Sequence, residues 1–141
     1  MQVAQNFFLI YNSNRLSSSN YLTMSNNSIL KSKIFDFAVR VINLYKYLKK
    51  RHGEYVISQQ IIRAGTSIGA LVREAEYAES RKDFLHKLHI SLKEANESVY
   101  WLELLYATDF ITKKMFDSVI NDATQLLKML ISSVKTVKSK I

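Results

Sequence analysis

Residues 55–79 have the sequence YVISQQIIRAGTSIGALVREAEYAE. Apolar residues recur along this segment at alternating spacings of four and three. They are Ile57, Ile61, Ala64, Ile68, Leu71, Ala75 and Ala78. Such an alternation keeps one side of a helix apolar along its whole length and is typical of the seam of a helix bundle. The segment therefore predicts a long helix that packs lengthwise against other helices.

The same spacing is found in three further segments, residues 32–51, 81–107 and 112–138. Their apolar series are Ile34, Ala38, Val41, Tyr45 and Leu48 in the first, Leu85, Leu88, Leu92, Ala95, Val99, Leu102 and Tyr106 in the second, and Phe116, Val119, Ala123, Leu126, Leu130, Val134 and Val137 in the third. Helices joined by links this short pack as antiparallel neighbours. The sequence predicts an all-α fold, an antiparallel up-down-up-down four-helix bundle.

Residues typical of helix ends flank these segments. Gly53 suits the position just after a helix, where a left-handed backbone is common. Ser80, with Asp83 three residues later, and Thr112 suit the N-cap position, where a side-chain oxygen accepts from a free backbone N–H. These residues place the turns between the predicted helices.

Gly65 and Gly69 lie inside the segment 55–79, although glycine costs roughly 1 kcal/mol relative to alanine in a helix interior. A glycine-rich run can wrap a phosphate, but this one lacks the lysine and the preceding strand of a P-loop. The pair therefore predicts a close crossing with a neighbouring helix.

The N-terminal residues have a different composition. Ser and Asn dominate from Tyr11 to Ser28, and both compete with the helix for backbone hydrogen bonds. We therefore expect residues 1–28 to be a disordered or loosely ordered extension and residues 29–141 to form the bundle domain. Met24 stands just before the periodic region, and we expect the native protein to start there.

The chain has 141 residues, enough for one domain with a continuous core, and it contains no cysteine. The lack of cysteine excludes disulfides, thiolate metal sites and cysteine nucleophiles. No segment approaches the ~20 apolar residues that span a bilayer, and the apolar run at residues 7–11 is too short for a signal peptide. We expect a cytoplasmic protein that does not enter the membrane.

Basic residues outnumber acidic ones, 20 to 12, so the net charge is +8. This surplus favours binding of nucleic acid, or it only keeps the protein soluble, and both interpretations stay open. In an up-down bundle, basic residues gather at both ends. One end has Lys46, Lys49, Lys50, Arg51, Lys113 and Lys114, and the other has Lys31, Lys33, Arg81, Lys82, Lys135, Lys138 and Lys140.

Apolar residues also lie beside the main seams. They are Phe35, Ile42, Phe84, Ile120, Leu127 and Ile131. A helix in a lone bundle needs one apolar face, so stripes this wide favour self-association, in which a second face packs against another subunit. The alternative is a broader contact within one chain.

Two groups of side chains are candidates for chemistry. His86 and His89, with Asp83 and Glu79 nearby, have a spacing that allows a shared metal ion, but the Glu-x-x-His motif of di-iron bundles is absent. The second group is Glu74, Glu94, Glu97 and Glu103. These glutamates can act as acid and base, or make polar contacts that fix helix register. No nucleophile context is present, so we expect exposed histidines, structural glutamates and no enzyme.

Several motifs resemble one bacterial family. They are QIIRAGTSIGA at residues 60–70, Glu74-Ala75, SRKDF at residues 80–84, Leu88, LKEA at residues 92–95 and YWL at residues 100–102. The chain resembles the four-helix bundle family that includes proteins encoded by intervening sequences in 23S ribosomal RNA genes. The resemblance covers residues 31–135. Leu71 departs from it, because the family usually has Asn there.

The resemblance implies a homopentameric ring with a basic central channel. It also implies kinship with the accessory bundle proteins of diversity-generating retroelements, which bind nucleic acid and a reverse transcriptase. Arg63 falls on a basic family position, and Glu74 and Glu94 fall on acidic ones, all three without a catalytic role.

We therefore expect a non-enzymatic oligomer that binds the RNA or DNA backbone, with no catalytic residue, cofactor or metal. The alternative is a protein-interaction scaffold that docks a partner such as a reverse transcriptase. The candidate nucleic-acid-binding residues are Arg40, Lys46, Lys49, Lys50, Arg51, Arg63, Lys113, Lys114, Lys135 and Lys138.

Overall fold

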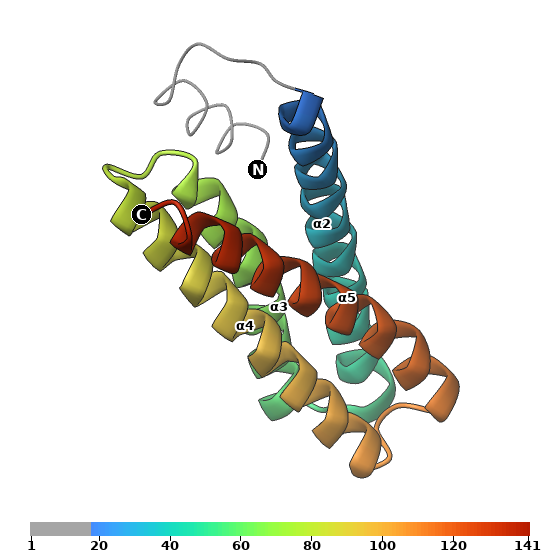
Figure 1. Cartoon of the computed structure of the whole chain (residues 1–141). Helices are drawn as coiled ribbons and strands as arrows, with labels where there is room; N and C mark the ends of the chain where they lie inside the picture. Colours follow the sequence, from blue (N-terminus) through green and yellow to red (C-terminus); the bar gives the residue numbers. More distant parts are fainter. Residues whose placement is uncertain (1–17) are drawn as a thin grey trace.

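The computed structural model describes the backbone of residues 18–141 and the side chains of residues 29–141. Over this range the fold is all-α, with helices α2 (Ser18–His52), α3 (Val56–Ala75), α4 (Arg81–Ala107) and α5 (Lys113–Lys138). Each helix packs against the next one in the chain, and α5 closes the bundle by returning to α2 (Figure 1). The predicted antiparallel four-helix bundle is confirmed. None of the described helices is both long and apolar enough to cross a membrane.

The first helix starts much earlier than expected. α2 begins at Ser18, although the Ser- and Asn-rich composition predicted a start near residue 32. Helix formation needs a costly first turn, but an existing helix extends residue by residue, and each Ser or Asn then costs only about 0.5 kcal/mol. The expected extension thus covers residues 1–17, which lie outside the described residues, and 18–28, which are helical. Its boundary at residue 28 stays a prediction.

The second helix ends earlier than expected. α3 stops at Ala75 rather than at residue 79, because the N–H groups of Tyr77 and Ala78 donate to carbonyls only three residues back, at 3.0 and 3.1 Å. These tighter turns leave the α-helical path. They also bury Ala78 and the side chain of Glu76 at the end of the bundle.

The predicted helix caps are confirmed. The Ser80 hydroxyl accepts from the Asp83 N–H at 3.1 Å, and the Thr112 hydroxyl accepts from the Met115 N–H at 3.2 Å. Gly53 has a φ of +58° and its N–H donates to the Lys49 carbonyl at 3.1 Å, which ends α2. These caps satisfy backbone groups that a helix end leaves without partners.

The core lies along the axis of the bundle. Its largest fully buried side chains are Phe37, Leu30, Leu48, Ile61, Ile68, Leu88, Leu102, Leu105, Leu126, Leu130, Val41 and Val72. The apolar periodicity thus identified most of the core. On α4 the buried face also includes Ser91, whose hydroxyl donates to the Ile68 carbonyl of α3 at 3.0 Å. Of the residues beside the seams, Phe84 belongs to this core, whereas Phe35 is 61% exposed.

The glycines of α3 lie at the crossing with α2, as predicted. A Cβ added at Gly65 would lie 2.8 and 2.9 Å from the two methyl groups of Val41, and one added at Gly69 would lie 3.0 Å from a methyl group of Ile34. Real Cβ atoms avoid contacts under 3.0 Å, so Gly65 lets the two helices approach more closely than any other residue allows.

Gly65→Ala tests this crossing. Alanine gains up to about 1 kcal/mol of helix propensity, but overpacking in a tight core costs about 1–3 kcal/mol. We expect the free energy of unfolding, measured in urea, to fall by about 1–2 kcal/mol. Adding Val41→Ala should recover part of the loss, and Gly69→Ala should cost less than Gly65→Ala. A Gly65→Ala variant as stable as the native chain would contradict the tight crossing.

Candidate nucleic-acid interface

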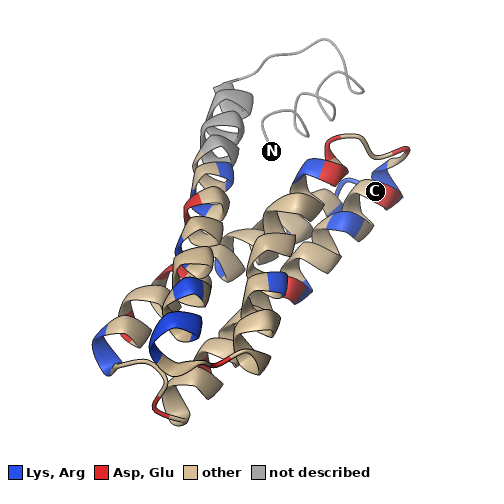
Figure 2. Cartoon of the chain, turned by 180° about the vertical axis from the view of Figure 1, so that it is seen from behind, with Lys and Arg blue, Asp and Glu red and all other residues tan. Residues whose placement is uncertain are grey.

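The bundle topology brings six of the predicted residues to one end of the molecule. α2 ends where α5 begins, so Lys46, Lys49, Lys50 and Arg51 share this end with Lys113 and Lys114. Figure 2 shows blue ribbon segments, which mark Lys and Arg, at the end of α2 and at the start of α5. A ring contact also joins the two regions, because His52 lies 5.4 Å from Phe110 in the link before α5. We call these six residues the basic pole.

The cation of Lys49 lies between two tyrosine rings. Its Nζ is 4.8 Å from the ring centre of Tyr45 and 5.4 Å from that of Tyr55, and it donates to the Tyr45 hydroxyl at 3.0 Å. The Gln59 side chain donates to the same hydroxyl at 3.4 Å. The hydrogen bond to Tyr45 raises the pKa of Lys49 above its ordinary value of 10.5.

Most other cations of the basic pole have no ion pair. Lys46, Lys50, Arg51 and Lys114 are exposed, and no acidic partner forms a salt bridge with them within residues 29–141. Lys113 differs, because it pairs with Asp117 one turn later at 2.6 Å, and this hydrogen bond raises the Lys113 pKa. The basic pole therefore has a local excess of positive charge.

Glu54, a buried acidic residue at this end of the bundle, caps α3. Its carboxylate accepts from the N–H groups of Val56, Ile57 and Ser58 at 2.8, 2.7 and 2.7 Å. These are three of the four N–H groups that a helix start leaves free. Burial raises the Glu54 pKa, but the three backbone donors and the Ser58 side chain lower it by more, so it lies below its ordinary value of 4.5.

Arg40 and Arg63 lie away from the basic pole and pair within the chain. Arg40 on α2 binds Asp122 on α5 and donates to the Ser118 carbonyl at 3.2 Å. Arg63 on α3 lies 3.3 Å from Glu94 and also pairs with Glu97, both on α4. These two arginines join neighbouring helices, and this geometry favours a structural role over phosphate binding.

Lys135 and Lys138 lie at the opposite end of the bundle, in the last turns of α5. At that end Lys31 pairs with the buried Glu76 at 2.8 Å, and an Arg81 nitrogen donates to the Lys140 carbonyl at 3.2 Å. Lys33 donates to the Gln125 side chain at 3.0 Å. Lys31, Lys33 and Arg81 are thus held by protein groups, whereas Lys82, Lys135 and Lys138 are exposed and form no salt bridge within residues 29–141.

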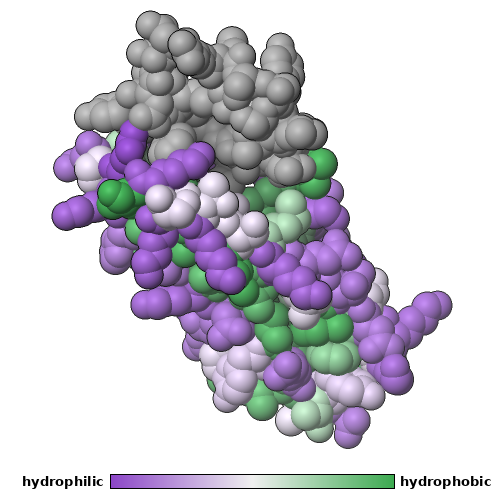
Figure 3. Space-filling view, in the orientation of Figure 1, coloured by the Kyte–Doolittle hydropathy of each residue, from purple (hydrophilic) through white to green (hydrophobic). Residues whose placement is uncertain are grey.

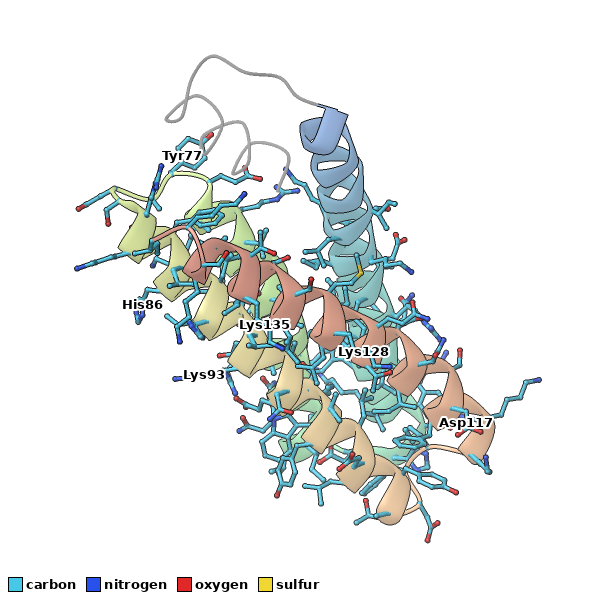
Figure 4. All side chains as sticks on the ribbon, viewed as in Figure 1. Tyr77, His86, Lys93, Asp117, Lys128 and Lys135 are labelled. Atoms are coloured by element: carbon cyan, nitrogen blue, oxygen red, sulfur yellow. The ribbon has the colours of Figure 1, made fainter. Side chains whose placement is uncertain are left out.

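Three of the glutamates that were candidates for acid–base chemistry make contacts between helices instead. Glu94 and Glu97 pair with Arg63 as described, and Lys87 pairs with Glu74 at 3.1 Å, so polar contacts fix α3 against α4. Glu74 is 56% exposed, not part-buried as its place beside Ala75 predicted. His86 points away from the bundle (Figure 4). Within residues 29–141 no three His, Asp or Glu side chains are grouped to hold a metal ion.

Two apolar surfaces remain on the outside of the bundle. The first, the α2 outer face, consists of Phe35, Val39 and Ile42, with Phe35 and Val39 61% and 42% exposed. The second, the α4/α5 stripe, has the half-buried or exposed residues Leu85, Leu92, Val99, Ile120, Leu127 and Ile131. Figure 3 shows a hydrophobic band between these two helices, and Lys93, Lys128 and Lys135 lie on the same side (Figure 4). Leu71 is half-buried.

Sequence reasoning missed three residues of this region. Tyr45 was assigned only to the core, although it binds Lys49, and neither Tyr55 nor Glu54 was assigned a role. One local signal was available for Glu54, since an acidic residue directly after Gly53 stands where the next helix begins. The Lys49–Tyr55 contact joins two helices across a turn, so spacing within one helix does not reveal it.

Known proteins resemble this chain over most of its length. The sequence model of a family described as 23S rRNA-intervening sequence protein matches residues 26–132. A solved structure from Bacteroides thetaiotaomicron VPI-5482, a protein of unknown function from the S23 ribosomal protein family, is 56% identical with a TM-score of 0.74. The match covers 75% of this chain and 98% of that one. No curated protein matches.

Glu54→Gln tests the cap at neutral pH. The substitution removes the negative charge from three N–H donors, and we expect the free energy of unfolding to fall by about 1–2 kcal/mol. Because the folded-state pKa is lowered, the stabilisation is complete above the unfolded pKa and disappears as pH falls through the folded one. The difference between native chain and variant, measured in urea, should thus shrink below about pH 4.5. A difference that does not change with pH would contradict the charged cap.

Proposed function

The chain belongs to the 23S rRNA-intervening sequence protein family, and from this premise we propose that it is a non-enzymatic protein that binds the RNA or DNA backbone with its basic pole. The observation that carries the proposal is the group of Lys46, Lys50, Arg51 and Lys114, exposed at one end and without ion pairs within residues 29–141. The proposal includes a cytoplasmic location, where such nucleic acids are found.

The physical basis is the release of counterions. Phosphates along a nucleic acid hold condensed cations, and each lysine or arginine that replaces one makes binding more favourable at low salt. Cations already paired with carboxylates contribute less, because they must first give up that partner. This argument favours the basic pole over Arg40 and Arg63, whose guanidinium groups are engaged with Asp122 and Glu97.

Self-association would repeat the basic pole. The α2 outer face and the α4/α5 stripe are different surfaces, and contact between two different surfaces builds rings when the rotation closes. The exposed Phe35 and Val39 support the first surface, and Ile131, 37% exposed, supports the second. We propose that the homopentamer implied by the resemblance forms through these two surfaces and brings the basic poles together on one side of a ring.

A protein-interaction scaffold is the second candidate function. The observation in its favour is that exposed apolar residues on α2 are large and contiguous at helical spacing. In this case the same face would dock a different protein, such as a reverse transcriptase. A partner protein that purifies with the chain in the absence of nucleic acid would favour this candidate.

The first prediction of the proposal concerns salt. We expect the chain to bind a labelled 20-base-pair DNA duplex in fluorescence anisotropy, with an affinity that falls linearly on a log–log plot against salt. The combined change Lys46→Gln, Lys50→Gln and Arg51→Gln should weaken binding. It should also reduce the slope by up to about 0.9 for each phosphate that the variant no longer neutralises.

A matched variant separates local from total charge. Arg73→Gln, Lys82→Gln and Lys93→Gln remove the same charge from exposed residues outside the basic pole, and we expect them to leave most of the binding and the slope intact. Equal losses in the two triple variants would mean that net charge alone attracts the duplex. No binding at low salt would end the nucleic-acid proposal.

A further prediction concerns the assembly. Phe35→Asp places a charge in the α2 outer face, and we expect light scattering to show a shift from an oligomer to a 16.3 kDa monomer. Asn121→Asp, which adds the same charge on an exposed position of α5 away from the α2 outer face, should keep the oligomer. A native chain that is monomeric at micromolar concentrations would contradict the ring.

A further inference from the structure

The tyrosine rings beside the basic pole point to a specific form of nucleic acid. We infer that the basic pole selects single-stranded over double-stranded nucleic acid by stacking an unpaired base on the ring of Tyr55. The inference rests on the proposed function, because the neighbouring cations hold the phosphate backbone.

The contact with Lys49 leaves much of the Tyr55 side chain exposed. Its side chain is 57% exposed although it stands at the start of α3, and it makes no capping hydrogen bond there. Glu54 performs the capping instead. Because Glu54 caps the helix, the exposed ring of Tyr55 is not needed for that task. It can therefore take part in binding.

The surroundings hold this ring in a defined place. Tyr55 follows directly after Glu54, whose carboxylate is fixed by three backbone hydrogen bonds, so its backbone is anchored at the helix start. The Lys49 ammonium lies 5.4 Å from the ring centre and is itself held by the Tyr45 hydroxyl. A preorganised ring loses little entropy when a base stacks on it.

The chemistry of the pair suits a single strand. An unpaired base offers a flat π-face that stacks on an aromatic ring whatever its identity, whereas bases inside a duplex are already stacked on each other. In single-strand sites, cations beside such a ring bind the phosphates of the strand. Here Lys46, Lys50 and Arg51 are exposed in the last two turns of α2. The basic pole thus combines the two elements of a single-strand site.

Two other exposed tyrosines, Tyr77 and Tyr100, lack this combination. Tyr77 is more exposed, at 83%, but it lies in the turn between α3 and α4 at the other end of the bundle, and no ammonium group lies over its ring within the described residues. Tyr100 packs against Trp101, with ring centres 4.9 Å apart. Tyr77 therefore serves as a matched control for Tyr55.

The test compares Tyr55→Leu with the native full-length chain in fluorescence anisotropy, using a labelled 20-nucleotide poly(U) RNA, a labelled dT20 and the 20-base-pair DNA duplex. We expect the native chain to prefer both single strands. Leucine keeps an apolar side chain but has no π-face, so Tyr55→Leu should bind the single strands about fivefold to tenfold more weakly and the duplex within about twofold of the native chain.

Two further variants make the result specific. Tyr55→Trp should keep or strengthen single-strand binding, which also shows that the start of α3 still folds. Tyr77→Leu should leave it within about twofold of native, because the ring lies away from the basic pole. The melting temperature of each variant confirms that the bundle is intact.

The outcomes separate this inference from the proposed function. If both strand types bind with a salt-dependent affinity, but Tyr55→Leu changes neither or weakens both equally, stacking on Tyr55 is wrong while backbone binding stands. A loss with Tyr77→Leu in place of Tyr55→Leu would likewise overturn the assignment. If neither probe binds at low salt, the proposed function itself fails.

Discussion

The close crossing of α2 and α3 at Gly65 sets the geometry of the whole bundle. Because the methyl groups of Val41 lie only 2.8 and 2.9 Å from where a Cβ of residue 65 would stand, the two helices approach closely and interlock at this point. This fixed register places Lys31 beside Glu76 at one end and Lys49 beside Tyr55 at the other. The candidate binding site is therefore a consequence of a packing contact in the middle of the helices.

The distribution of charge follows from the same packing. Where two helices lie side by side, their arginines meet acidic residues of the neighbour, as Arg40 meets Asp122 and Arg63 meets Glu97. Such part-exposed pairs contribute only about 0–1 kcal/mol each to stability, but they neutralise the sides of the bundle. At the basic pole, Lys46, Lys50, Arg51 and Lys114 make no such pair within residues 29–141, so an excess of positive charge remains there.

The sequence predicted the features that depend on one helix at a time. Apolar spacing identified the four helices and most of the core, and the caps at Ser80 and Thr112 followed from local chemistry. The predicted start of α2 was wrong because a helix, once formed, extends cooperatively through residues that do not favour helix formation themselves. The pairing of Arg63 with Glu97 and the position of Tyr55 beside Lys49 depend on the rotation of helices about their axes, which a single sequence does not determine.

Glu54 connects the stability of the fold with the charge of the site. An exposed acid beside Lys49 and Lys50 would cancel part of their charge and repel phosphate. Glu54 is instead 9% exposed, and its carboxylate is directed at three N–H groups of α3, where the positive end of the helix dipole compensates it. The free N–H groups at the start of α3 are thus bound by Glu54 of the same chain. Lys46, Lys50 and Arg51 therefore stay available for an external anion.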